Sequence, residues 1–200
     1  MKEIKLVGKR IILDKCKLLL KSAPDKDWEK DWKVMAGEWH YEDGALIGKE
    51  DGNCGGILFS RENYKGKNVM ITFTGSTVAP ATRDVNAVFC AEWDDELNDL
   101  GDSYVCGLNG WYDDKAGLER NLKGGGVSFR ALTNSYKYTP GKEIRMTAGA
   151  INGHLFMVVD DELVAEYFDN FEPLKGGHVG ISPYCTILKI KDIEVHEIYW

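Results

Sequence analysis

The stretch INGHLFMVVDDELVAEYFD, residues 151–169, decides how the fold of this chain is to be interpreted. Two apolar runs flank the aspartate pair at positions 160–161, and each run has the length of a β-strand. Leu155, Met157 and Val159 fall on one face of the first run, because successive side chains of a strand point to opposite faces. Aspartate tolerates the left-handed backbone that a two-residue turn requires, so the stretch predicts an antiparallel hairpin.

The rest of the chain repeats this pattern and favours an all-β fold. Short runs of Val, Ile, Phe, Tyr and Thr alternate with Gly, Asn and Asp clusters, which is typical of a sandwich or barrel. So many strands exceed one flat sheet, and we expect two sheets packed face to face. The segment 25–34 is the best helix candidate, and it can equally be a loop that enters a strand. We expect strands at 3–7, 10–20, 38–41, 44–49, 55–60, 67–75, 85–93, 104–112, 127–132, 143–151, 153–159, 162–168, 177–182 and 186–198.

Composition excludes several functional classes. A chain of 200 residues without a long linker suits one β-sandwich domain, 1–200. The formal charge of −7 argues against a nucleic-acid partner, because phosphate binding needs a basic surface. The five cysteines are scattered without CxxC spacing, which argues against a zinc or redox motif. No apolar run fits a signal peptide or a membrane span, so we expect a cytoplasmic protein without a membrane partner.

The order of these segments resembles the concanavalin A-like lectin/glucanase superfamily. The family has a strand pair with a turn acid and Leu-Val-x-Glu, then Gly-x-x-Gly-Ile, then a long alternating final strand. The segments that match this order are Val158–Glu166, Gly177–Ile181 and Leu188–Ile198. The early DWKVMAGEW, DGALIG and GGILFS segments are also similar to the start of these domains. Within the superfamily the chain looks most like the uncharacterised bacterial YesU-like proteins, over residues 31–198.

The resemblance implies a jelly-roll β-sandwich of two curved antiparallel sheets, with a ligand groove on the concave sheet. Members of the superfamily bind or cleave polysaccharides, and many carry a structural calcium near the terminal strand. The YesU-like setting implies an oligosaccharide ligand, pectin-derived or from other plant cell-wall breakdown, inside the cell. For a calcium ion, the acidic positions that we single out are Asp169 and Asp192.

Strand alternation selects the candidate ligand-binding residues. In VNAVFCAEWDDE, alternation places Val85, Phe89 and Trp93 in the core, with Asn86 and Glu92 on the groove side. In YVCGLNGWY, an indole lies beside an asparagine and two glycines, where a sugar ring can stack on it. The segment DDKAGLERN is similar to an ER…NL segment of YesU-like proteins and has the composition of a turn. The predicted substrate-binding residues are Trp111, Asn109, Asn86, Arg120, Asn121 and Arg130.

An enzyme is the competing hypothesis. Glu92, Asp94 and Glu96 have the E-x-D-x-E spacing of superfamily glucanases, in which two glutamates serve as nucleophile and acid/base. Here Trp and Asp stand between the acids and the run continues into an acidic loop, so an acidic strand end is the alternative. His40 in GEWHYED is a further candidate base for a glycoside hydrolase or polysaccharide lyase. A third hypothesis is a non-catalytic protein-interaction module without a sugar site.

Overall fold

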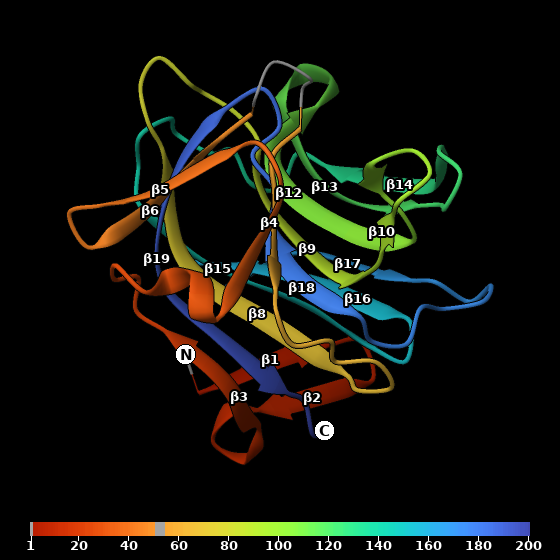
Figure 1. The fold of residues 1–200 in the computed structure, drawn as a ribbon. Coiled ribbons are helices and arrows are strands. Elements are labelled where there is room, and N and C mark those ends of the chain that lie inside the picture. The colour runs from red at the N-terminus through yellow and green to blue at the C-terminus, as the bar shows by residue number, and fades with distance from the viewer. Residues whose placement is uncertain (1, 51–54) are drawn as a thin grey trace.

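The computed structural model describes residues 2–50 and 55–200, and in them two large antiparallel sheets, of seven and eight strands, face each other (Figure 1). Strands of the seven-stranded sheet follow in the spatial order β14 (Val127–Thr133), β13 (Lys115–Asn121), β12 (Ser103–Trp111), β9 (Val85–Ala91), β18 (His178–Ile181), β7 (Ile57–Ser60) and β4 (Trp32–Ala36). Strands of the eight-stranded sheet follow in the order β17 (Glu162–Phe168), β16 (His154–Val159), β15 (Ile144–Ile151), β8 (Val69–Thr77), β19 (Ile187–Glu197), β6 (Ala45–Lys49) and β5 (Glu38–Glu42), while β3 (Lys17–Ser22) pairs with β19. This architecture is the predicted all-β sandwich.

Short elements complete the fold. Two small antiparallel pairs stand apart from the large sheets, β1 (Glu3–Leu6) with β2 (Lys9–Ile12), and β10 (Trp93–Asp94) with β11 (Asp99–Leu100). Single 3₁₀ turns occur at η1 (Leu13–Lys15), η2 (Trp28–Lys30) and η3 (Tyr112–Asp114). The segment 25–34 is therefore a short turn that leads into strand β4, and not a helix. Trp28 in the turn and Trp32 in the strand are both buried in the core.

The core lies between the two sheets, and strand alternation builds it. Leu155, Met157 and Val159 of β16 point into this core, as their parity predicts. The turn after β16 is also as predicted, since Asp160 and Asp161 have φ values of 49° and 71°. The backbone N–H of Arg145 and the Lys142 ammonium both donate to the Asp160 carboxylate, each at 2.9 Å.

The return strand departs from simple alternation. The register between β16 and β17 shifts after Met157, so Val164 enters the core and Leu163 is exposed. Simple alternation would place Leu163 on one face with Ala165 and Tyr167, and this bulge moves it to the opposite face.

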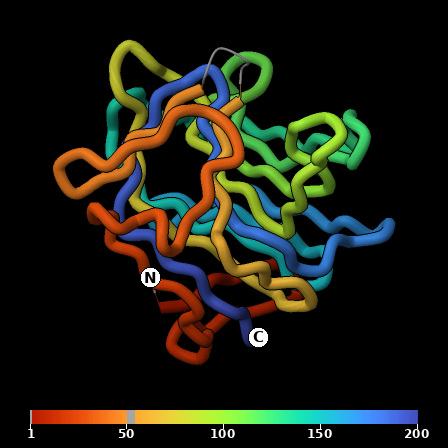
Figure 2. Tube along the Cα trace, viewed as in Figure 1, coloured from red at the N-terminus to blue at the C-terminus, as the bar shows by residue number. Residues whose placement is uncertain are grey.

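The hairpin β1–β2 covers the outer face of the eight-stranded sheet. Ile4, Leu6 and Ile11 pack there against a set of buried side chains that includes Phe156 and Val158. The end of β19 joins this cluster, and the two segments lie together at the lower side of the tube view (Figure 2). Strand β16 is consequently buried on both faces, which explains its unbroken apolar sequence.

Candidate functional site

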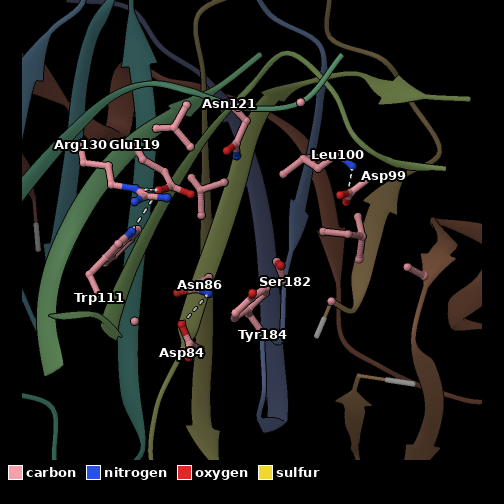
Figure 3. Close-up of a pocket in the computed structure, with 18 of the residues that line it drawn as sticks. Asp84, Asn86, Asp99, Leu100, Trp111, Glu119, Asn121, Arg130, Ser182 and Tyr184 are labelled. Carbon is pink, nitrogen blue, oxygen red and sulfur yellow. Dashed lines mark hydrogen bonds and ion pairs between the residues drawn. The ribbon is translucent and has the colours of Figure 1, made fainter. Parts of the chain in front are cut away.

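A cleft of about 980 Å³ lies on the outer face of the seven-stranded sheet, the face turned away from the core. Side chains of β4, β7, β9, β12, β13 and β14 form its floor, and the segments 97–100, 112–114 and 125–126 form its rim. Figure 3 shows its polar side chains gathered around an open centre. A volume of this size matches the upper range of small-molecule pockets, about 300–1,000 Å³.

One side of the cleft is organised by Glu119, a residue that the sequence analysis did not select. Its Oε2 atom accepts a hydrogen bond from Trp111 Nε1 at 3.0 Å and another from Arg130 Nε at 2.8 Å (Figure 3). A single carboxylate thus fixes the indole and the guanidinium together on the cleft wall. The ring of Trp111 lies over Gly117, where a Cβ atom would come within 3.3 Å of the indole.

Beside Trp111 the cleft carries a buried polar pair, Asp84 and Asn86, which are 3% and 5% exposed (Figure 3). Asn86 Nδ2 donates to Asp84 Oδ1 at 3.5 Å, while the buried Asn86 Oδ1 accepts no hydrogen bond from any described residue. Two glycines of β12 make room for the pair. A Cβ at Gly107 would lie 1.7 Å from Asn86 Oδ1, and one at Gly110 would lie 2.6 Å from Asp84 Oδ1.

Burial raises the pKa of the Asp84 carboxyl to about 7, because desolvation disfavours the charged form. The adjacent Arg83 guanidinium, whose Nε lies 3.0 Å from Asp84 Oδ2, and the hydrogen bond from Asn86 lower this pKa in part. The carboxyl of Asp84 therefore changes its charge near neutral pH, within the cleft.

Four of the six predicted substrate-binding residues line the cleft: Asn86, Trp111, Asn121 and Arg130. Arg120 and Asn109 do not. Arg120 points into the interior and forms a buried ion pair with Asp169 at 2.8 Å, so the expectation that it faces the groove is corrected. Strand alternation explains this difference, since Glu119 and Asn121 on either side of Arg120 take the outer face.

Asn109 has a structural role in place of the predicted ligand contact. Its φ of 54° lies at an irregularity in β12, and its side chain forms two hydrogen bonds with the backbone of Tyr138. Nδ2 donates to the Tyr138 carbonyl at 3.0 Å and Oδ1 accepts from the Tyr138 N–H at 3.3 Å. These bonds occupy the amide away from the cleft.

Glu92 lines a smaller side pocket of about 310 Å³ on the same face of the sheet. Its floor includes Phe59, which stacks on His178 at 5.2 Å and meets Trp93 edge-on at 6.3 Å. His178 donates from Nδ1 to the Ser60 carbonyl at 2.7 Å, which leaves Nε2 as the acceptor nitrogen. The four histidines are dispersed along the sequence, so no sequence motif marks His178.

The predicted parity of β9 fails at Cys90, which has a φ of 50°. Cys90 enters the core there, and Trp93 packs with the apolar cluster of the outer face instead of the core. The chain then leaves the large sheet, and Asp94 uses its carboxylate to accept backbone N–H groups, among them those of Glu96 and Gly124 at 3.0 and 2.8 Å. The acidic run is thus a turn at a strand end, with Glu96 exposed beside the side pocket's lining rather than part of it.

His40 lies on β5, in the eight-stranded sheet, and neither the cleft nor the side pocket includes it. Its ring is 59% exposed and Nε2 is 3.9 Å from the Glu42 carboxylate. The structure therefore does not bring His40 together with the other predicted site residues.

The two acidic positions predicted for calcium do not form one site. Asp169 Oδ2 accepts from Arg120 at 2.8 Å and from the Tyr104 hydroxyl at 2.7 Å. Asp192 is exposed at a bulge of β19, which β8, β15 and β16 separate from β17. Within 2–50 and 55–200, three or more His, Cys, Asp or Glu side chains nowhere come together as metal ligands. These residues do not fit a shared calcium site.

No helix in the part of the chain that the structure describes has the length and apolar composition needed to cross a membrane.

Neither a family model nor a curated protein matches this sequence, whereas solved structures do. Carbohydrate-binding module CBM66 from Bacillus subtilis has a TM-score of 0.65 and 14% identity, over 84% of this chain and 96% of that chain. A protein of unknown function with a galectin-like fold, also from Bacillus subtilis, has a TM-score of 0.69 and 13% identity, over 91% and 96%. The exoplasmic/lumenal domain of VIP36 in its Ca²⁺/Man-bound form has a TM-score of 0.57 and 8% identity, over 84% of each chain. The fold is therefore the lectin-like β-sandwich that the hairpin and its flanking segments predict.

Proposed function

We propose that the cleft on the seven-stranded sheet binds an oligosaccharide. The observation that carries the proposal is the joint placement of an indole, Trp111, and buried or half-buried polar groups in one open cleft of about 980 Å³. Sugars present apolar ring faces and polar hydroxyl edges, so their sites need aromatic surfaces beside hydrogen-bonding groups. The similar structures include a carbohydrate-binding module and a mannose-bound domain, which supports a carbohydrate ligand for this fold.

Each cleft residue has a role in this proposal. Trp111 stacks against a sugar ring, and its indole is held by Glu119 in one orientation. Asn86 contributes a polar amide to the floor of the cleft beneath the ligand. Arg130 and Asn121 donate hydrogen bonds from β14 and β13, in keeping with their predicted role as substrate-binding residues.

The source of the ligand rests on the YesU-like resemblance of the sequence. On this basis we propose that the ligand is a pectin-derived oligosaccharide inside the cell. Pectins contain both neutral sugar chains and uronate chains, and the two kinds present different chemistry to the cleft.

Truncation of Trp111 tests the proposal. Calorimetric titration with a panel of pectic and glucan oligosaccharides should reveal one class that binds the wild-type protein with saturation. Trp111→Ala should bind that class at least about tenfold more weakly, equivalent to about 1.4 kcal/mol, because the stacking surface is lost. Calorimetry is preferred to fluorescence here, since the substitution also removes the fluorophore.

Trp200→Ala is the matched control. Trp200 is 55% exposed and lies outside the cleft, so its loss should leave the affinity for the oligosaccharide unchanged. If no sugar binds the folded wild-type protein, or if Trp111→Ala binds as tightly as the wild type, the proposal fails and a protein-interaction module becomes the better reading.

Hydrolysis is a second candidate, favoured by the carboxyl of Asp84 with its pKa of about 7 in the same cleft as Glu119. Glycosidases pair a carboxylic acid that stays protonated with a carboxylate that stays ionised. Chromatography of the titrated mixtures separates the two candidates. Shorter products would indicate an enzyme, and unchanged oligosaccharide would indicate binding alone.

A further inference from the structure

The described part of the cleft is acidic, although it contains arginines. Its lining has five carboxylates, those of Asp84, Asp99, Asp113, Asp114 and Glu119, and two guanidinium groups, those of Arg83 and Arg130. With Asp84 protonated, four carboxylates still oppose two cations. Like charges disfavour an anionic ligand in a site whose low-dielectric walls focus the field.

Each arginine already has a carboxyl partner inside the cleft. Arg83 Nε lies 3.0 Å from Asp84 Oδ2, and Arg130 Nε lies 2.8 Å from Glu119 Oε2. A ligand carboxylate would have to displace one of these partners. Displacing Glu119 from Arg130 would still leave a half-buried carboxylate beside the incoming anion, with Trp111 as its donor.

The charged groups that the rim exposes to a ligand are hydrogen-bond acceptors. Asp99, Asp113 and Asp114 line the cleft and are exposed, so their carboxylate oxygens are open to a ligand, whereas the buried Asn86 Oδ1 packs against Gly107. The Trp111 N–H, in contrast, is already donated to Glu119. An ionised carboxylate accepts hydrogen bonds only, whereas a hydroxyl or an ammonium group can donate to these oxygens.

We propose that the cleft selects neutral or amino-substituted oligosaccharides and rejects uronates. The inference rests on the proposed function and specifies its ligand class. A pectin fragment would accordingly bind through neutral sugar units and not through free galacturonate.

Matched pairs of sugars that differ only in charge test this selection. One pair is a methyl-esterified oligogalacturonate and its de-esterified form, and the other is a cello-oligosaccharide and its C6-oxidised uronate form. In calorimetry at low salt, the neutral member of a pair that binds should do so at least tenfold more tightly than its acid form. The difference should shrink as salt rises, because exposed charges are screened.

The double variant Asp113→Asn/Asp114→Asn sharpens the test. Both residues are exposed and have φ values of 57° and 55°, a conformation that asparagine tolerates well. The Asp113 carboxylate is 4.0 Å from the Lys115 ammonium, a long distance for an ion pair, so the substitution removes only a weak contact. Removing two rim charges should reduce the ratio between the affinities of the neutral and the acid member of each pair.

The outcomes separate the two proposals. If an acid form binds as tightly as its neutral partner or more tightly, the charge selection is overturned while carbohydrate binding stands. If neither member of either pair binds, and no oligosaccharide of the wider panel binds either, the proposed function falls and the selection falls with it.

Discussion

Asp84 is a buried carboxyl group whose position in the fold costs stability. Its carboxyl is buried, its backbone has a φ of 60°, and its ionisation is opposed by desolvation. A protein gains no stability from such a group, and perturbed carboxyls cluster at functional sites. The sequence VAPATRDVNAV does not predict the burial of Asp84, because this residue precedes strand β9 and strand alternation assigns it no face.

Asp84→Asn should change how stability depends on pH. The folded pKa of about 7 is above the ordinary 3.8, so the unfolded chain releases the Asp84 proton first and stability falls as pH rises from about 4 to 7. The difference between the folded and unfolded pKa values lowers the free energy of unfolding of the wild type by about 4 kcal/mol at pH 8. Denaturant unfolding of both proteins from pH 4 to 8 should show the variant gaining stability relative to the wild type across this window.

Asp99→Asn is the control for this measurement. Asp99 lines the same cleft but is exposed, and its neutralisation should leave a pH profile parallel to that of the wild type. Parallel profiles for wild type and Asp84→Asn would show that the Asp84 carboxyl ionises normally in the folded protein.

At the scale of a strand, alternation predicts faces only where the strand is regular. In β9 it places Val85 and Phe89 in the core correctly, and it fails beyond Cys90, whose left-handed φ moves Trp93 to the outer face. A bulge changes the face of every residue that follows it in the strand. The sequence has no glycine at this point that would indicate a bulge. Glu119 was missed for a different reason, since DDKAGLERN has the composition of a turn and forms strand β13.

The hairpin β16–β17 also holds the N-terminal hairpin β1–β2 in place. Buried His154 lies 2.8 Å from Glu166 Oε2 through Nε2 and 3.3 Å from the Lys9 ammonium through Nδ1. Glu166 Oε2 also accepts the backbone N–H of Val7 at 3.0 Å. Glu166 is the acid of the Leu-Val-x-Glu segment, so in this chain that motif joins two elements rather than forming part of the cleft.

Glu166→Ala should destabilise the protein by about 1–3 kcal/mol, because it leaves Nε2 of the buried His154 ring without a hydrogen-bond partner. Glu162→Ala, an exposed position on the same strand, should change the free energy of unfolding by no more than about 0.5 kcal/mol. Denaturant unfolding monitored by tryptophan fluorescence would measure both. Equal effects of the two substitutions would show that the Glu166 contacts do not stabilise the fold.

For the whole molecule, the fold could be predicted better than the site. Alternating strands, turn residues and segment order are local signals, and they predict the sandwich and the core face of β16. The cleft depends on residues from six strands whose order in space is not their order in the sequence. Trp111 and Arg130 were found from their own strands, whereas the pairing of both with Glu119 needs the sheet.

The most direct test of the central claim is a ¹H–¹⁵N NMR titration that follows the six tryptophan indole signals as oligosaccharide is added. The signal absent from Trp111→Phe identifies the cleft indole. We predict that this signal shifts with saturation, while those of Trp28 and Trp32, buried in the core, stay in place. A Trp111 signal that does not move with any oligosaccharide, or that stays fixed while the Trp93 signal of the side pocket shifts, would contradict the account.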